Sequence, residues 1–284
     1  MTQMSDTIAT YTKVMETKVM EIAEAAPEYK VDPSKTLLLV VDLQNDGGRE
    51  EGFAGKAGFD VSLEQKIEPV VAKLVKRAQQ VGVSACYVQC IYDFHYLIPN
   101  MREQFEMVKL PEGMCNKGTW GAKFVDTLPK PDLWLVKSHF SSFSPYTFLF
   151  DPELQPEIVE YLSLPAERDE ELKKQNKKTL HDYFLEAQAH SAVATSSNID
   201  KLMAMGVVGF DAYLKAKGID TIIITGASTH VCVDAAVCGA AERGYRLLLP
   251  VDAIAGEDHD KHWCYLHNHG FFKGRPLTAD KVKF

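Results

Sequence analysis

The chain has 284 residues, of which 46% are hydrophobic and 25% charged, a balance typical of globular proteins with a sizeable core. Its net charge of −8 argues against a surface that binds nucleic acid or anionic membranes, and no stretch approaches the ~18 apolar residues of a membrane span. We therefore expect a small-molecule partner, and scattered cysteines with no apolar secretion signal predict a cytoplasmic protein with reduced thiols.

The first half of the chain predicts an arm, two strands and a helix. Residues 1–34 carry apolar positions at helical spacing and form the expected N-terminal helical arm. Thr36–Val41 is a continuous apolar run closed by Asp42, as in a buried parallel strand. Ser62–Val81 has a helical period with Ser62 as its N-cap, and Val83–Gln89 predicts the next strand.

The middle of the chain interrupts this alternation. Gly113–Leu128 begins irregularly and is expected to become a short helix, after which Asp132–Val136 predicts a strand that ends at Lys137. Residues 146–205 include a charged stretch and an Ala/Ser-rich stretch, and we interpret them as an insertion before a helix at Val208–Lys217.

Residues 221–244 place one cysteine where a buried strand leads into a helix. The β-branched run Thr221–Thr225 predicts the strand, and the Ala-rich Val233–Arg243 predicts the helix. Cys232 would then lie at the positive end of the helix, which favours a thiolate and offers backbone N–H groups to an oxyanion. The alternative is a buried structural cysteine. A strand at Tyr245–Val251 and a histidine-bearing helix follow.

Strands that alternate with helices predict a three-layer α/β/α fold with a mostly parallel central sheet of the Rossmann type. Ligands bind such sheets beyond the carboxyl ends of the strands, where Asp42, Lys137 and Cys232 are expected. An acid, an amine and a thiol at one edge suit thiol-based acyl transfer. The alternative is a structural Asp–Lys pair beside an unrelated cysteine.

Four stretches of the sequence, LLLVVDLQND, GTWGAKFVD, LVKSHFSSF and IIITGASTHVCVDAAVCGAAERGYRLLLPVDA, resemble the isochorismatase-like cysteine hydrolases. The resemblance covers most of 36–255, which implies a hydrolase domain at 35–284 with 146–205 as a helical insertion. It implies a catalytic triad of Asp42, Lys137 and Cys232 and a cis peptide between Ala227 and Ser228. The backbone N–H groups of Ser228 and Cys232 would form the oxyanion hole.

The resemblance also implies an activity, because members of that family with the cysteine are mostly amidases of small amides and carbamoyl compounds. AGFDVS at 57–62, with Gln89 and Trp120, looks most like the ureidoacrylate, biuret and N-carbamoylsarcosine amidohydrolase branch. We expect C–N hydrolysis through a thioester, ammonia release and no cofactor. The alternatives are a metal-assisted, nicotinamidase-like amidase and a catalytically lapsed binding module of the same fold.

The substrate-binding candidates are Gln44, Gln89, Trp120, Phe140 and His230. Ordinary core and strand-end packing is the alternative for Gln89 and Trp120. Two departures from the family leave the substrate open: the arginine common after the lysine is absent here, and His230 stands where asparagine is common.

Metal binding is not expected. Asp93 and His95 resemble part of a nicotinamidase-type metal site, but 96–101 supplies no second histidine, and zinc normally takes three or four ligands. The four histidines between 259 and 269 do not share one helix face, so we interpret this helix as solvated or as part of an interface.

Two expectations concern the segments outside the resemblance. The arm at 1–34 predicts a homo-oligomer, a dimer or tetramer, in which the arm helps to cover a neighbour. Residues 146–205 start nine residues after Lys137 and carry apolar faces at helical spacing, which predicts a mostly helical cover over the active-site edge.

Overall fold

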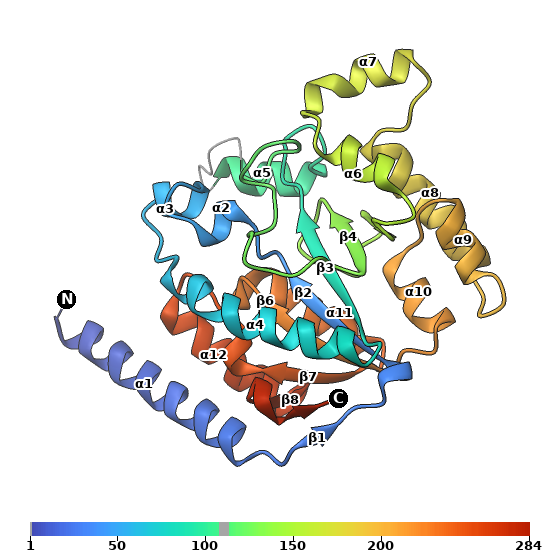
Figure 1. Ribbon diagram of the computed structural model, residues 1–284. Helices are drawn as coiled ribbons and strands as arrows, with labels where there is room; N and C mark the ends of the chain where they lie inside the picture. The colour runs from blue at the N-terminus through green and yellow to red at the C-terminus, as the bar shows by residue number, and fades with distance from the viewer. Residues whose placement is uncertain (1, 108–113) are drawn as a thin grey trace.

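The computed structural model describes residues 2–107 and 114–284, and its centre is a seven-stranded sheet of order β5-β4-β3-β2-β6-β7-β8 (Figure 1). Neighbouring strands run parallel, except that β5 is antiparallel to β4. The mostly parallel sheet is thereby confirmed. The strands are β2 (Thr36–Val41), β3 (Ser84–Cys90), β4 (Leu133–Lys137), β5 (Thr147–Phe150), β6 (Thr221–Gly226), β7 (Arg246–Pro250) and β8 (Arg275–Leu277).

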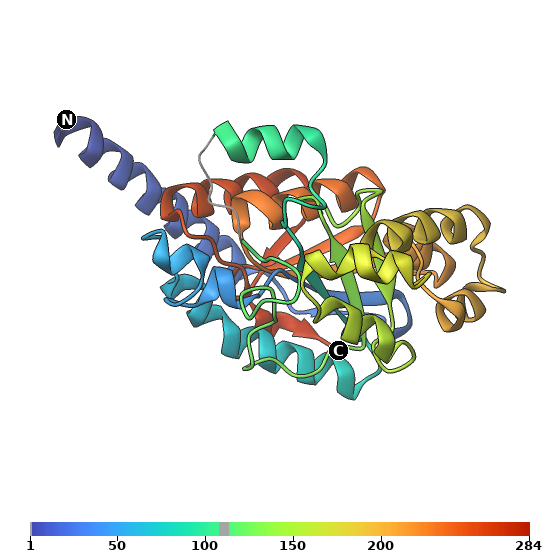
Figure 2. The same cartoon turned by 90° about the horizontal axis from the view of Figure 1, so that it is seen from above.

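Helices cover both faces of the sheet, with α4 on one side and α5, α11 and α12 on the other (Figure 2). Alternate side chains of the fully buried strand β2 pack on opposite faces of the sheet. Leu38 and Val40 belong to the apolar cluster with α4, whereas Leu37 and Leu39 belong to the cluster with α11. The longer helices are α1 (Thr2–Ala25), α4 (Ser62–Gln80), α5 (Pro99–Met107), α8 (Leu180–Val193), α11 (Asp234–Glu242) and α12 (His259–Phe272). The shorter helices are α2 (Asn45–Gly48), α3 (Phe53–Lys56), α6 (Pro156–Leu162), α7 (Asp169–Lys174), α9 (Ile199–Met205) and α10 (Phe210–Ala216).

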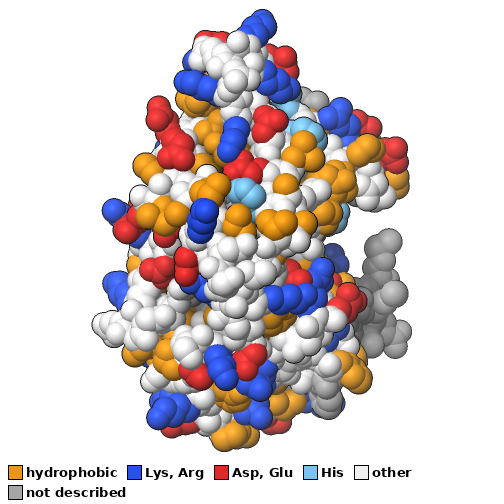
Figure 3. Space-filling model, turned by 90° about the vertical axis from the view of Figure 1, so that its right-hand side faces the viewer, with side chains coloured by type: hydrophobic (Ala, Val, Ile, Leu, Met, Phe, Trp, Pro, Cys, Tyr) orange, Lys and Arg blue, Asp and Glu red, His pale blue; other side chains and the backbone are white. Residues whose placement is uncertain are grey.

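Residues 146–205 are not wholly an insertion outside the sheet, because β5 at their start is its edge strand. The helices α6 to α9 that follow lie beyond this edge (Figure 1). Phe148 and Phe150 of β5 pack with Tyr183 and Phe184 of α8 in a separate apolar cluster. The segment therefore covers the edge of the sheet, and its face shown in Figure 3 mixes acidic, basic and apolar side chains.

Two local predictions are wrong. The described residues 114–128 form turns and bends but no helix, because they wrap over the ends of β2 and β3, with Asn45 N–H donating to Lys123 O at 2.9 Å. Ser62 is not the N-cap of α4. Ser62 is the first residue of the helix and Val61 its N-cap, and the Ser62 N–H donates to the Asp60 carboxylate at 2.9 Å.

The N-terminal helix α1 packs against α12, and its N-terminal end extends past the body of the molecule (Figures 1 and 2). Thr12 hydrogen-bonds to Asp260, and Lys281 Nζ donates to Glu24 O and Ala26 O at 2.5 and 2.6 Å. The short strand β1 (Tyr29–Lys30), which follows α1, then pairs with β9 (Val282–Lys283) near the C-terminus. Within the described residues, no helix has the length and apolar character needed to span a membrane.

Candidate active site

Three elements bring Asp42, Lys137 and Cys232 to the carboxyl end of the sheet. Asp42 follows β2 with a left-handed backbone (φ 48°), Lys137 ends β4, and Cys232 lies in a π-helical turn, Thr229–Val233, between β6 and α11. Lys137 Nζ is 2.8 Å from Asp42 Oδ2 and donates to Phe140 O at 2.7 Å. All three side chains are buried, so the charges form an ion pair shielded from water.

The turn that carries Cys232 depends on a glycine at the end of β6. A Cβ on Gly226, whose φ is +107°, would lie 2.1 Å from Val41 O, so no other residue lets β6 lie this close to β2. The next peptide, Ala227–Ser228, is cis. The N–H groups of Val231 and Val233, on either side of Cys232, both donate to Ser228 O at 3.1 Å. This turn fixes the backbone from which the thiol projects.

Burial controls the charge states of the three groups. Burial raises the pKa of Asp42, and the Lys137 ammonium and the thiols of Cys232 and Cys90 offset only part of that rise. Burial and the Asp42 carboxylate raise the pKa of Cys232 well above its ordinary value, although Lys137 lowers it in part. Burial and the neighbouring Asp42 thus oppose, in the resting site, the thiolate that the helix end was expected to favour.

Tyr92 is a fourth group at the thiol, and the sequence motifs did not indicate it. Its hydroxyl lies 3.2 Å from Cys232 Sγ, in a buried contact. Burial raises the pKa of Tyr92 well above its ordinary value, so the phenol keeps its proton. Tyr92 comes two residues after β3, which lies between β2 and β4, and this position was the available signal.

A cavity of about 400 Å³ opens beside the thiol. Its walls combine aromatic and aliphatic side chains with three thiols, two glutamines and three carboxyl groups. The lining residues are Asp42, Gln44, Gly47, Phe53, Ala54, Phe59, Glu64, Cys90, Tyr92, Gln104, Phe105, Met114, Cys115, Phe140, Ala227, Ser228, Val231, Cys232 and Glu257. None of these lies in 146–205, so that segment is no cover for the cavity in this structure.

The structure separates the five substrate-binding candidates. Gln44 and Phe140 line the cavity, whereas Gln89, Trp120 and His230 are not among its described lining residues. The Gln44 amide is engaged by the protein: Nε2 donates to Cys90 O at 3.0 Å and to Ala122 O at 2.8 Å, and Oε1 accepts from Cys90 N–H at 2.9 Å. Its role is to hold the end of β3 in place.

The other three candidates lie outside the cavity for different reasons. Gln89 is buried and donates to Ala122 O at 2.7 Å. Trp120 is 49% exposed, and its carbonyl accepts from Asn45 at 2.9 Å. The His230 ring stands behind the cavity wall, with Nε2 3.3 Å from Glu257 Oε1. None of the three side chains is among the described residues that line the cavity, so a role in substrate binding stays a prediction for them.

Two glutamates that line the cavity, Glu64 and Glu257, were not predicted as site residues. Burial, reinforced by the charges of Glu257 and Asp42, raises the pKa of Glu64 to about 8. Burial alone would also raise the pKa of Glu257, but hydrogen bonds from His230 and Ser228 lower it to about 2. Near neutral pH the cavity thus holds one protonated and one ionised glutamate.

The histidine-containing segments show no metal-binding arrangement within the described residues. His95 Nδ1 contacts the Asp93 carboxylate at 2.7 Å, and the described part of the chain has no group of three or more His, Cys, Asp or Glu placed to hold a metal ion. In α12, His262 is buried 2.6 Å from Thr229 Oγ1, and His269 is buried 3.3 Å from Asp234. These two histidines face the interior, whereas His259, Asp260 and Lys261 at the start of α12 are exposed.

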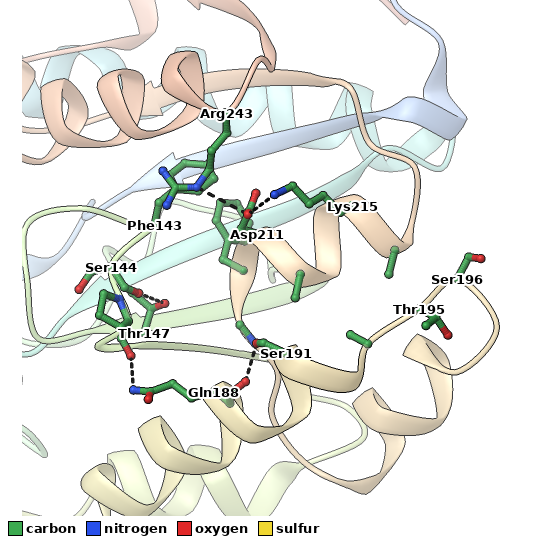
Figure 4. Close-up of a pocket in the computed structure, with 17 residues that line it drawn as sticks. Phe143, Ser144, Thr147, Gln188, Ser191, Thr195, Ser196, Asp211, Lys215 and Arg243 are labelled. Carbon is green, nitrogen blue, oxygen red and sulfur yellow. Dashed lines mark hydrogen bonds and ion pairs between the residues drawn. The ribbon is translucent and has the colours of Figure 1, made fainter.

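A larger groove of about 730 Å³ lies between α8, α10 and residues 143–147 (Figure 4). Its polar side chains bond to the protein: Gln188 donates to Pro145 O at 3.0 Å, and Ser191 Oγ accepts from Gly209 N–H at 2.9 Å. Asp211 pairs with Lys215 at 2.7 Å and with Arg243 at 3.6 Å. Although this groove is larger than the cavity beside Cys232, none of its described lining residues is a cysteine.

Comparison with known proteins places this geometry in context. The model of the Isochorismatase domain matches residues 36–162 and 164–269, and so includes most of 146–205. A ureidoacrylate amidohydrolase of Agrobacterium fabrum is 34% identical over 134 residues, which are 42% of this chain and 59% of that protein. The chain thus spans less than two thirds of that relative's length.

Solved structures agree with the fold. A cysteine hydrolase from Pseudomonas syringae superposes with a TM-score of 0.59 at 16% identity and covers 91% of this chain and 95% of its own. An N-carbamoylsarcosine amidase from Thermoplasma acidophilum has a TM-score of 0.53 at 18% identity, with 88% and 99% covered. At these identities the likeness shows the architecture alone.

Proposed function

Because the chain belongs to the isochorismatase family, we propose that it is a cysteine-dependent amidohydrolase that cleaves a C–N bond of a small amide or carbamoyl compound. The family model spans most of the chain and confirms the resemblance of its motifs. One observation carries the proposal: the buried Asp42–Lys137 ion pair adjoins the Cys232 thiol at the wall of a cavity. A nucleophile next to a base that is itself held by a third group is the general arrangement of covalent hydrolases.

The proposed reaction has two halves. Cys232 Sγ attacks the amide carbonyl while its proton passes to Asp42, because a thiol with a raised pKa needs a base at the moment of attack. Protonated Asp42 then gives that proton to the leaving nitrogen, the C–N bond breaks, and ammonia and a thioester result. A water molecule, deprotonated by Asp42, attacks the thioester, and the acid leaves as Cys232 takes the proton back.

Lys137 and the turn before Cys232 assist both halves in this proposal. The Lys137 ammonium, whose raised pKa keeps it charged despite burial because Asp42 lies beside it, holds the carboxylate in place. The backbone N–H groups of Ser228 and Cys232 would donate to the oxyanion of each tetrahedral intermediate. We propose no metal or organic cofactor for these steps.

The ureidoacrylate amidohydrolase that this chain resembles supplies a candidate substrate class, a carbamoyl compound. Its sequence matches only part of this chain, so the acyl group is open to experiment. The test is ammonia release from ureas, carbamoyl acids and primary amides, followed by Cys232→Ser and Asp42→Asn. Loss of activity in both variants supports the mechanism, and activity that survives both contradicts it.

For assembly, we propose a homo-oligomer in which α1 contacts a neighbouring copy. One face of α1 packs on its own chain through Met15 and Val19, while Tyr11 and Val14 on other positions are exposed. Light scattering at micromolar concentration should give a multiple of the 31.7 kDa chain mass. A monomer would refute this proposal without affecting the amidase.

A further inference from the structure

The cavity beside Cys232 has an unusual balance of charge. Asp42, Glu64 and Glu257 line it, whereas none of its described lining residues is lysine, arginine or histidine. The charge of Asp42 is matched by Lys137, and Glu257 is held by Ser228 and His230. Glu64 is the carboxyl group for which the described residues offer no such match.

Glu64 is both buried and unpartnered. It is 5% exposed, at the start of α4, and its Oε2 has no hydrogen-bond partner among the described residues. Leaving a buried polar group without a hydrogen bond is energetically costly. Although Oε2 itself is buried, Glu64 is one of the residues that line the cavity. A ligand in the cavity can therefore reach the Glu64 carboxyl group and supply the partner that the described residues do not.

The remaining wall fits a cation. Aromatic rings of Phe53, Phe59, Phe105 and Phe140 line the same cavity, and ring faces attract ammonium and guanidinium groups. A carboxylate entering this cavity would meet Glu257, and no described lining side chain carries a positive charge. The contacts therefore favour a positive group and disfavour a negative one.

We infer that Glu64 is a specificity residue, and that the substrate is a small amide that carries a protonated amine and lacks a carboxylate. This inference rests on the proposed amidase function and names its substrate class. Glu64 accepts hydrogen bonds from the ammonium group in the complex, while the amide end of the substrate lies against Cys232. This differs from the anionic compound in the name of the ureidoacrylate amidohydrolase.

Binding should also displace a proton. Glu64 faces Glu257, Asp42, Glu68 and Arg49, and burial with its acidic neighbours raises its pKa to about 8 in the free protein. An ammonium group beside Glu64 stabilises the ionised carboxylate and lowers that pKa. At pH 7 the bound cation should therefore release up to about one proton from Glu64 to the solvent.

The experiment uses three amides of equal length: 3-aminopropanamide, butanamide and succinamic acid, which end in an ammonium, a methyl and a carboxylate. Calorimetry on the Cys232→Ala protein, at pH 7 in two buffers of different ionisation enthalpy, measures affinity and proton release. Ammonia release by the unsubstituted protein measures kcat/KM for the same compounds. Glu64→Gln removes the charge while keeping the shape, and Glu50→Gln is the control at an exposed carboxylate outside the cavity.

We expect 3-aminopropanamide to be preferred over butanamide by about tenfold or more, and over succinamic acid by a larger factor. Glu64→Gln should remove both this preference and the proton release, and Glu50→Gln should change neither. Equal or tighter binding of succinamic acid, or a preference that persists in Glu64→Gln, would overturn the inference. If 3-aminopropanamide binds through Glu64 but no amide releases ammonia, the amidase proposal fails and the cation preference stands.

Discussion

The two hollows of this molecule differ in a way that their sizes do not predict. The groove between α8 and α10 is the larger, at about 730 Å³, but its polar groups bond to one another and to the backbone. The cavity at the end of the sheet has about 400 Å³, and its lining includes the acid of a buried ion pair, a thiol and a glutamate with an unpartnered carboxyl oxygen. Reactive or unpartnered buried groups, rather than volume, therefore distinguish the candidate site from the larger groove.

The largest expected effect comes from the thiol. Cys232→Ser should lower kcat by about 10³-fold or more, because the hydroxyl is a far weaker nucleophile beside a carboxylate base. Ser191→Ala, in the groove, should leave kcat within about twofold. Ammonia release under saturating substrate measures kcat for both variants. Equal losses of kcat in the two variants would contradict the assignment of the active site to the cavity beside Cys232.

The ion pairs in the two regions should differ in their contribution to stability. Lys137→Met leaves Asp42 charged and buried, and should lower the free energy of unfolding by about 3–5 kcal/mol. Lys215→Met breaks a pair with Asp211 in which the lysine side chain is 63% exposed, and should cost no more than about 1 kcal/mol.

Urea denaturation gives both values. The double variant Asp42→Asn/Lys137→Met should recover part of the loss, because it leaves no unpaired buried charge. If Lys137→Met lowered the free energy of unfolding as little as Lys215→Met, water would have to reach the Asp42 carboxylate.

The hydroxyl of Tyr92 should have a smaller effect on catalysis. Tyr92→Phe removes the hydroxyl that lies 3.2 Å from Cys232 Sγ. It should lower kcat by about tenfold with little change in KM, because a hydroxyl at this position stabilises the sulfur most when the sulfur carries negative charge. Tyr245→Phe removes a hydroxyl that donates to Asp211 at 2.7 Å beside the groove, and should not change kcat. Steady-state kinetics of both variants provide the check, and unchanged kcat in Tyr92→Phe would exclude a role in the chemical step.

The smallest expected effect concerns pH and stability at Glu64. Its folded pKa of about 8 lies above its ordinary value of 4.5, so this group's contribution to stability is complete below pH 4.5 and is lost as pH rises through 8. Glu64→Gln should therefore gain in Tm relative to the unsubstituted protein between pH 5 and pH 8.5, by roughly 3 °C or more. Thermal melts across this range test the sign, and a difference that is constant with pH would show that Glu64 is not buried in its neutral form.

The central sheet was predictable because its strands are continuous apolar runs. Thr36–Val41 and Thr221–Thr225 could only be buried strands in an alternating α/β pattern, and their ends placed Asp42 and Cys232 at one edge. The edge strands β5 and β8 were missed because four and three residues carry too little pattern. The irregular structure of residues 114–128 was not predicted, because their path depends on contacts with Asn45 and Asp46, which are distant in the sequence.

The walls of the site were less predictable than its centre. Glu64 has the sequence context of a solvated residue in an amphipathic helix, and only the close packing of α2 against α4 buries it. Gln89 lies near the site in a sequence motif, but its side-chain amide is held by Ala122 O of a distant loop. Long-range packing, which no local pattern reports, determined these outcomes.

The most direct test of the account is to trap the acyl group on the enzyme. A hydrolysed amide is mixed with the protein, the reaction is quenched in acid within milliseconds, and intact-mass and peptide mass spectrometry locate any adduct. We expect an added mass equal to the acyl group on the peptide that contains Cys232, and no such adduct in Cys232→Ala. An adduct on another residue, or undiminished ammonia release by Cys232→Ala, would contradict it.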